Sequence, residues 1–327
     1  MTNAVHVFAL AALLGAPALA AAAAPLPAMK AQQASISGLS SGAFMAVQYQ
    51  VAYSASVIGA GVIAGGPYYC AGGDMMTAIG SCKGSDVASL AEITRKRAQA
   101  GQVDPVARLS THRVWLFSGS ADKLVPTATV ADLERYYKAF IPAAQVQFKQ
   151  DLPAGHGMPT LSYGAKCDAL AAPFINNCGY DAAGQLLNWI YGPLAAPSTG
   201  AQAGKLLEFD QAEFLPDPGK HGMAATGYVY VPPGCENGGA GCKVHIALHG
   251  CAQDIGNVQD AFARNAGYNN WADTNRIVVL YPQAAAITPM PNPKACWDWW
   301  GYDDADYSIK KGRQLRAIKA MTDRLSG

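Results

Sequence analysis

A serine flanked by glycines is the first feature of the sequence that could carry out chemistry. Residues 38–42 read Gly-Leu-Ser-Ser-Gly, which places Ser40 midway between two glycines. A segment that predicts a strand, 34–36, precedes this motif, and a helical pattern begins at Ala43. A strand, a sharp turn and a helix in this order form a nucleophile elbow, in which the glycines permit the strained turn that exposes the serine hydroxyl. The alternative is an ordinary strand-to-helix loop.

A serine hydroxyl becomes a useful nucleophile when a histidine accepts its proton and a carboxylate orients that histidine. His156 stands between two glycines after a predicted strand, and Asp122 follows another predicted strand. Asp151 is the competing carboxylate, but its closeness to His156 in the sequence favours a turn or salt-bridge role. We therefore expect a triad of Ser40, His156 and Asp122. The alternatives are an exposed loop histidine and an aspartate that only stabilises a turn.

Attack on an ester carbonyl creates a negative oxygen that needs hydrogen-bond donors. The backbone N–H of Ser41 supplies one donor, because this residue follows the nucleophile. The second donor usually comes from a glycine-containing loop earlier in the chain, but the suitable loop here lies much later. It reads His-Gly-Cys-Ala-Gln at 249–253, after a predicted strand. The backbone N–H of Cys251 is the candidate, and a strand-end turn held by a disulfide is the alternative.

The cysteines indicate disulfides and no metal site. The chain has eight cysteines, none with the C-x-x-C spacing of a zinc or redox motif. Eight cysteines can pair in 105 ways. Proximity favours three pairs and leaves one more: Cys70 with Cys82, Cys167 with Cys178, Cys235 with Cys242, and then Cys251 with Cys296. The sequence leaves the true pairing open, and we expect no cofactor and no metal.

Composition and the N-terminus define the class of protein. The chain has 327 residues, of which 50% are apolar and 14% charged, with a net charge of +1. A disordered chain is excluded, and the absence of a basic run argues against nucleic acid as a partner. Residues 1–24 lack charged side chains and run from an apolar stretch into alanines, which predicts a signal peptide cleaved near 20–24. An uncleaved anchor is the alternative. We expect a secreted monomer, extracellular or periplasmic, with no stable membrane insertion.

Apolar, β-rich segments alternate with helical patterns, which predicts an α/β fold with a mostly parallel sheet and helices on both faces. The predicted strands are 34–36, 59–64, 113–117, 146–148, 227–231, 244–248 and 277–281. The predicted helices are 43–53, 130–139, 184–191, 257–274 and 314–325. Residues 192–204 have the composition of a linker. Neither half holds enough elements for a domain of its own, so we expect one domain over 25–327.

The order of the elements is rotated relative to that of an α/β-hydrolase, which reaches its elbow midway and ends with the carboxylate, the histidine and a closing helix. Here the elbow comes first, and the oxyanion strand follows the linker. Joining the helix predicted at 314–325 to the strand at 34 restores the usual order. We infer a circular permutation, which is tolerated when the two termini lie close together on the surface.

Five motifs together resemble secreted poly(3-hydroxybutyrate) depolymerases, specifically the circularly permuted single-domain type known from a fungus. The motifs are Gly38-Leu39-Ser40-Ser41-Gly42, Gly119-Ser120-Ala121-Asp122, Gly155-His156-Gly157, Leu248-His249-Gly250-Cys251-Ala252-Gln253 and Cys296-Trp297-Asp298-Trp299. The likeness covers nearly all of the chain after the signal peptide, and the last two motifs are the most specific. It implies cleavage of a polyester by the triad and donors given above. It also supports a bridge between Cys251 and Cys296.

Aromatic side chains follow the last cysteine. Residues 296–302 read Cys-Trp-Asp-Trp-Trp-Gly-Tyr and hold three of the six tryptophans. Rigid apolar faces suit the methyl-bearing units of a polyester, so Trp297, Trp299, Trp300 and Tyr302 are candidate substrate-binding residues. The resemblance implies a substrate-contacting tryptophan at the position of Tyr302, where this chain departs from the family. The alternative for Trp297 and Trp299 is core packing around the disulfide.

We therefore expect a secreted serine esterase that hydrolyses poly(3-hydroxybutyrate) or a related short-chain polyhydroxyalkanoate through an acyl-serine intermediate. Its partners would be the polymer surface and oligomers. One alternative is a carboxylesterase of the same fold that acts on small, feruloyl, acetyl-sugar or synthetic polyester substrates. The other is a polymer-binding protein without catalytic activity.

Overall fold

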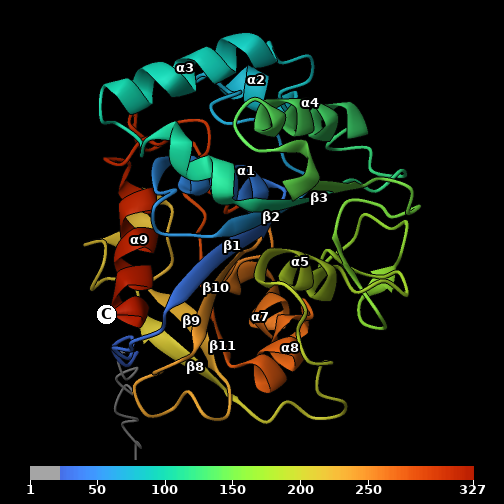
Figure 1. Ribbon diagram of the computed structural model, residues 1–327, viewed down its shortest axis with the longest axis vertical. Coiled ribbons are helices and arrows are strands. Elements are labelled where there is room, and N and C mark those ends of the chain that lie inside the picture. The colour runs from blue at the N-terminus through green and yellow to red at the C-terminus, as the bar shows by residue number, and fades with distance from the viewer. Residues whose placement is uncertain (1–22) are drawn as a thin grey trace, which may run out of the picture.

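A computed structural model describes residues 23–327 of the chain, so all but two residues of the predicted signal peptide lie outside the described part. One eight-stranded sheet crosses the molecule in the order β4-β3-β2-β1-β10-β11-β9-β8 (Figure 1). Its strands are β1 (Gln33–Leu39), β2 (Gly59–Ile63), β3 (Arg113–Phe117), β4 (Val146–Lys149), β8 (Lys205–Asp210), β9 (Thr226–Val231), β10 (Lys243–Leu248) and β11 (Ile277–Tyr281). A small second sheet holds β5 (Met158–Thr160), β6 (Ala165–Lys166) and β7 (Ile175–Asn177).

The centre of the main sheet is parallel and fully buried. β1 pairs in parallel with both β2 and β10, and only the pairings of β9 with β11 and with β8 are antiparallel. Every residue of β2 and β11 is buried, which explains why these strands read as continuous apolar segments: both of their faces are covered by helices. The predicted mostly parallel α/β sheet is confirmed.

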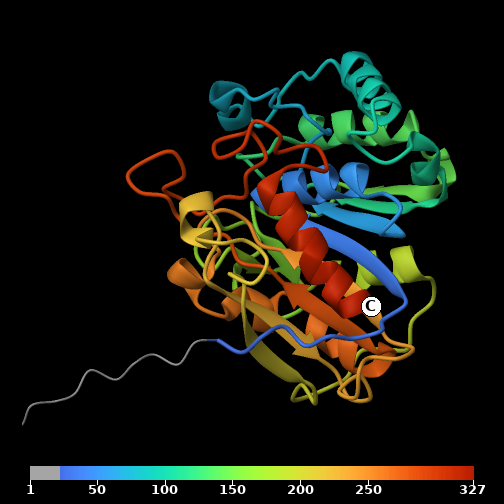
Figure 2. The ribbon, with the colours of Figure 1, turned by 90° about the vertical axis from the view of Figure 1, so that its left-hand side faces the viewer.

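Helices cover both faces of this sheet (Figures 1 and 2). On one face, α1 packs against β1, β2 and β10, and α4 and α9 lie beside it; on the other face, α5 packs against β2 and β3 while α8 packs against β11. The helices are α1 (Ser41–Ala52), α2 (Met75–Ile79), α3 (Val87–Gln99), α4 (Thr127–Lys138), α5 (Ala182–Tyr191), α6 (Ile255–Val258), α7 (Ala261–Asn265), α8 (Tyr268–Asn275) and α9 (Arg313–Ser326).

One predicted helix was wrong, and several elements were not predicted. The helix expected at 257–274 is three short helices, because Gln259 (φ +55°) and Gly267 (φ +95°) leave the right-handed helical region between them. The strands β5 to β8 and the helices α2 and α3 were missed. β8 is an edge strand in which only Phe209 is buried, so its apolar alternation is weak.

The strand order is that of a circularly permuted α/β-hydrolase. Counted from β8 as the first strand, through β11 and then from β1 to β4, the sheet reads 1-2-4-3-5-6-7-8 from one edge to the other. The end of α9 meets the segment before β1, where Met29 N–H donates to Arg324 C=O (2.9 Å) and Ala31 N–H to Leu325 C=O (3.0 Å). The two ends that the permutation separates are therefore hydrogen-bonded neighbours. Segment 192–204 contains no helix or strand and is fastened to α8 through Asp273, which accepts from Ala203 N–H (2.9 Å).

All eight cysteines form disulfides: the three pairs that proximity favoured and the pair that these left over. The bridges are Cys70–Cys82, Cys167–Cys178, Cys235–Cys242 and Cys251–Cys296. The last closes the longest loop, with a separation of 45 residues. No helix within residues 23–327 combines the length and the apolar character needed to span a bilayer.

Candidate active site

The turn between β1 and α1 has the geometry of a nucleophile elbow. Ser40 adopts φ 55° and ψ −122°, a region that non-glycine residues occupy at a cost and that clusters at functional sites. The glycines on either side are required by space. A methyl group on Gly38 would lie 2.2 Å from the carbonyl oxygen of Gly42, and one on Gly42 would lie 2.4 Å from that of His249. The C-terminal end of the central strand β1 thus presents Ser40 at a tight, close-packed turn.

Two loops at the same end of the sheet bring the histidine and the carboxylate together. His156 Nδ1 lies 2.8 Å from Asp122 Oδ2, and the two side chains are 8% and 1% exposed. The other oxygen, Asp122 Oδ1, accepts from the backbone N–H groups of Leu124 (2.8 Å) and Val125 (3.0 Å), which fix the carboxylate. With Nδ1 engaged by Asp122, Nε2 is the ring nitrogen left to accept a proton.

The competing carboxylate, Asp151, lies elsewhere. Its side chain is 75% exposed and pairs with Lys149 Nζ at 2.7 Å. Two further histidines are confined to the core: His245 lies between Ser35 and Ser37, each 2.7 Å from a ring nitrogen, and His112 Nδ1 accepts from Gln50 Nε2 at 3.0 Å. Burial lowers the pKa of His245 to about 3 and that of His112 to about 4, so both stay neutral and enclosed.

Ser40 and His156 open into one cavity of about 400 Å³. Ser41 and Cys251, the predicted oxyanion donors, also line it. Ser41 is the first residue of α1, so its N–H has no partner within the helix and lies at the positive end of the helix dipole. Within residues 23–327, the Cys251 N–H likewise has no protein acceptor. The cavity therefore holds a hydroxyl, an imidazole and two free amide donors.

The loop that carries Cys251 reaches the elbow because β10 lies beside β1, with Leu248 in register with Gly38. The loop and the elbow are in close contact: a methyl group on Gly250 would lie 3.4 Å from Ser40 Cβ. Ser40 and Cys251 are 211 residues apart in the chain (251 − 40), so only the sheet order makes them neighbours.

The predicted aromatic residues divide into two groups. Trp299 and Trp300 line the cavity, and Trp299 stacks on Phe44 with ring centroids 3.9 Å apart. Trp297 is fully buried beneath the cavity, with its indole N–H donating to His249 C=O at 3.0 Å. Tyr302 does not line the cavity: its hydroxyl accepts from Gln314 Nε2 at 3.0 Å and donates to Cys296 C=O at 3.0 Å. The structure thus places Trp297 and Tyr302 outside the cavity wall.

Apolar side chains that the sequence analysis did not single out surround the cavity mouth. Met75, Ile79, Leu124 and Met290 line the cavity and are 41%, 67%, 49% and 54% exposed, respectively. We call these four residues the apolar rim. Large exposed apolar side chains clustered at a cavity indicate a binding surface. Two of them belong to α2, a helix too short to show a clear period, so no pattern in the sequence marked them.

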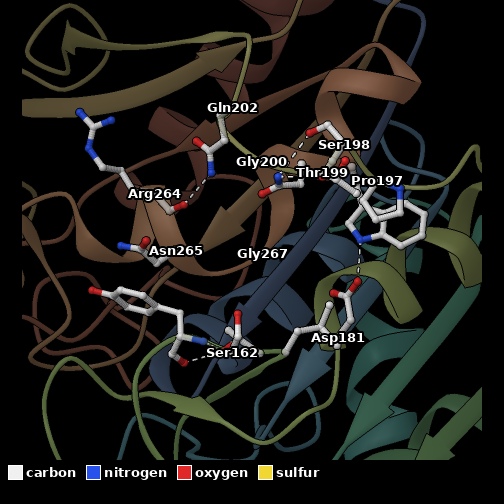
Figure 3. A pocket seen from close by; sticks show the side chains of 15 residues that line it. Ser162, Asp181, Pro197, Ser198, Thr199, Gly200, Gln202, Arg264, Asn265 and Gly267 are labelled. Atoms are coloured by element: carbon white, nitrogen blue, oxygen red, sulfur yellow. Dashed lines mark hydrogen bonds between the residues drawn. The ribbon is translucent and has the colours of Figure 1, made fainter.

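A second cavity, of about 440 Å³, lies between segment 197–202 and the α7–α8 region (Figure 3). Its carboxylate, Asp181, is already engaged: it accepts from Gly184 N–H (2.8 Å) and from the Trp271 indole (2.7 Å). No histidine lines this cavity in the described part of the chain, so a hydroxyl such as that of Ser162 has no base beside it. Of the two cavities, the first therefore combines a hydroxyl with an imidazole, and the second does not.

The strand order and the elbow define a circularly permuted α/β-hydrolase. No family model matches the chain. It is 49% identical over 314 residues to a poly(3-hydroxybutyrate) depolymerase of Delftia acidovorans, covering 93% of this chain and 62% of that protein. It is 39% identical to a polyhydroxybutyrate depolymerase of Talaromyces funiculosus over 93% of both chains. The chain belongs to the polyhydroxybutyrate depolymerase family.

Solved structures agree with this assignment. The crystal structure of PHB depolymerase from Penicillium funiculosum matches with a TM-score of 0.85 at 34% identity, covering 92% of this chain and 98% of that one. A PHB depolymerase complexed with an R3HB trimer matches with a TM-score of 0.86 at the same identity and coverage. The chain spans 62% of the length of the Delftia relative, so that protein contains a further region that these residues do not match.

Proposed function

We propose that this chain is a secreted serine esterase that hydrolyses poly(3-hydroxybutyrate) or a related short-chain polyhydroxyalkanoate. One observation carries the proposal: the hydrogen-bonded pair of His156 and Asp122 and the strained Ser40 open into the same apolar cavity. The family assignment supports the polyester as substrate. The four disulfides and the predicted signal peptide support export through an oxidising compartment. Residues 25–327 would act as one catalytic domain.

The proposed reaction has two steps. In the first, Ser40 Oγ attacks the ester carbonyl carbon, His156 Nε2 takes the hydroxyl proton, and the tetrahedral oxygen is held by the N–H groups of Ser41 and Cys251. The intermediate collapses to acyl-Ser40, and the departing alcohol end of the polymer takes the proton from His156. In the second, His156 removes a proton from water, which attacks the acyl carbon; the C–O bond to Ser40 breaks, His156 returns the proton to Ser40 Oγ, and a carboxylic acid is released. Asp122 stabilises the imidazolium in both steps.

The apolar rim supports a polymer surface as the partner. Its exposed side chains surround an opening whose inner wall holds Trp299 and Trp300. Contact between an apolar rim of this kind and a solid polyester lowers the free energy, because apolar area of both the protein and the polymer is removed from water. The end of a polymer molecule that enters the cavity would place an ester carbonyl beside Ser40, while the remainder of that polymer molecule stays on the rim.

Matched aspartate variants test the triad. We expect Asp122→Asn to lower kcat for p-nitrophenyl butyrate by about 10⁴-fold, the loss seen when a triad aspartate becomes neutral. Asp151→Asn should keep wild-type activity. Ser40→Ala should abolish turnover and labelling by an organophosphonate while the protein stays folded. Equal activity of the two aspartate variants would contradict the assignment.

Clearing of a poly(3-hydroxybutyrate) film tests the substrate. Film clearing together with release of hydroxyacid supports the proposal. Hydrolysis of soluble esters without film clearing would instead favour a small-ester carboxylesterase, and a folded protein that binds the film but neither clears it nor reacts at Ser40 would favour a polymer-binding protein.

A further inference from the structure

His249, the residue before the glycine of the oxyanion loop, is fully buried and takes no part in the proposed reaction. Its two ring nitrogens have different partners. The backbone N–H of Ala284 donates to His249 Nε2 at 3.0 Å, so Nε2 carries no proton. The proton of the neutral ring is therefore on Nδ1, which lies 2.7 Å from the carbonyl oxygen of Gly250 and donates to it. Burial lowers the pKa of His249, which keeps the ring neutral.

The Gly250 carbonyl and the Cys251 N–H belong to one peptide group. In a planar trans peptide these two bonds point in opposite directions. Since His249 holds the carbonyl toward the core, the Cys251 N–H points the other way. That side is the cavity, which Cys251 lines together with Ser40.

The rest of the loop is fastened in the same way. The Trp297 indole N–H donates to His249 C=O (3.0 Å), and Gly250 N–H donates to Gln253 Oε1 (2.8 Å). Gln253 Nε2 in turn donates to the backbone carbonyl of Phe174 (3.0 Å). Every backbone polar group from His249 C=O to Gly250 C=O therefore has a partner. The Cys251 N–H is the next group along the chain and, within residues 23–327, has none.

We infer that His249 is a positioning residue that fixes the orientation of the Gly250–Cys251 peptide and so preorganises the oxyanion hole. The inference rests on the proposed function, because it assumes that the Cys251 N–H stabilises the tetrahedral oxygen. Preorganised donors are effective because no reorientation has to occur as the charge develops. Without the Nδ1–H bond, the peptide is free to rotate its N–H away from the cavity.

The test compares two buried histidines of one strand and its following loop. His249→Leu removes the donor to the oxyanion peptide. His245→Leu is the matched control: His245 is equally buried, four residues earlier, and contacts Ser35 and Ser37 but not the loop. For p-nitrophenyl butyrate, we expect His249→Leu to lower kcat roughly 10- to 100-fold, less than the loss of a whole oxyanion donor, with KM changed less than about threefold. His249→Asn, which offers an amide donor near Nδ1, should recover part of kcat.

Inhibition by a transition-state analogue provides a second measurement, which would not change if His249 only stabilised the fold. A trifluoromethyl ketone forms a tetrahedral adduct with the nucleophilic serine, and its inhibition constant should weaken by the same factor as kcat/KM in His249→Leu. The His245→Leu variant, assayed below its own melting temperature, should keep kcat and the inhibition constant within about threefold. Unchanged kcat in His249→Leu, or equal losses in the two leucine variants, would overturn the inference.

If His249→Leu does not fold, a measurement on the wild-type protein tests the hydrogen bonds of His249 directly. ¹⁵N NMR should show a neutral His249 ring that is protonated on Nδ1. A ring protonated on Nε2, or an imidazolium at neutral pH, would contradict the hydrogen bonds on which the inference stands. A wild-type protein that neither hydrolyses the ester nor binds the ketone would refute the proposed function instead, whatever the tautomer of His249.

Discussion

Gly42 packs closely against the end of the strand that leads to the oxyanion loop, and this close approach predicts that Gly42→Ala loses both stability and activity. Gly42 is in the first turn of α1, and a methyl group there would lie 2.4 Å from the carbonyl oxygens of both Leu248 and His249. Both obstacles are backbone atoms, so no flexible side chain can move aside. The helix and the strand must separate instead, and this separation moves Ser40 relative to Cys251.

The size of the effect follows from the distances. Ordinary contact begins near 3.4 Å, so the two segments must part by about 1.0 Å (3.4 − 2.4). Overpacking of this kind costs about 1–3 kcal/mol of unfolding free energy, which corresponds to roughly 2–12 °C in melting temperature for a chain of this size. A 1 Å misplacement of reacting groups lowers the rate by about 100-fold. We expect Gly42→Ala to show both losses.

The assay measures kcat/KM for p-nitrophenyl butyrate at a temperature where the variant is folded, together with thermal unfolding by calorimetry. Gly219→Ala is the control, since a methyl group at Gly219 would meet nothing within 4 Å. It should change neither quantity. If Gly42→Ala kept wild-type kcat/KM and melting temperature, the close approach between α1 and the 248–249 segment would be refuted. A loss of stability without a loss of rate would show that the spacing between Ser40 and Cys251 does not limit catalysis.

Three further changes have predictable results. Ser41→Ala should keep kcat within about threefold and cost no stability, because the backbone N–H remains and the Ser41 hydroxyl is buried without a partner. Replacing Cys251 and Cys296 by alanine should cost about 2–4 kcal/mol of unfolding free energy and lower kcat several-fold, since the disulfide holds the oxyanion loop. Acid should destabilise the fold: His112 and His245 have pKa values of about 4 and 3 in place of 6.5, so their stabilising contribution is complete above pH 6.5 and is lost as the pH falls from 6.5 to about 3.

Each of these three has its own comparison. Ser41→Ala with kcat lowered 100-fold would show that the hydroxyl, and not the N–H, acts on the substrate. Removal of the Cys235–Cys242 bridge, which joins the ends of the β9–β10 connection, should lower stability without lowering kcat; equal losses of kcat in the two disulfide variants would contradict a special role for the loop. Unfolding free energies that stay constant between pH 6.5 and 4 in denaturant titrations would contradict buried, neutral histidines.

Some features of this protein could be predicted from neighbouring residues alone. The strands at 113–117 and 277–281 have their predicted bounds, because strands buried over four or five consecutive residues leave continuous apolar segments. The elbow at Ser40 was predicted from its glycines, since the steric demand of a sharp turn acts over a few residues. The three nearby cysteine pairs were favoured by their short separation in the sequence. Local order therefore comes from short-range sterics and hydrophobic periodicity, which the sequence displays directly.

Choices among distant candidates were left to the tertiary structure. The sequence offers both Asp122 and Asp151 near a predicted strand end, but only Asp122 lies 2.8 Å from His156, while Asp151 pairs with Lys149 at the surface. The strand order also brings Cys251 beside Ser40. Such distances depend on which strands become neighbours in the sheet, and that depends on packing summed over the whole chain.

The binding surface shows the same division. The tryptophan segment was recognisable, but which of its residues face the cavity was not: Trp299 and Trp300 line the cavity, whereas Trp297 does not. The apolar rim comes from segments far apart in the chain, represented by Met75, Leu124 and Met290. The type of a residue determines which side-chain chemistry is available at its position. Whether that side chain faces substrate, solvent or core depends on what the rest of the fold places against it, and no local pattern of residues contains that information.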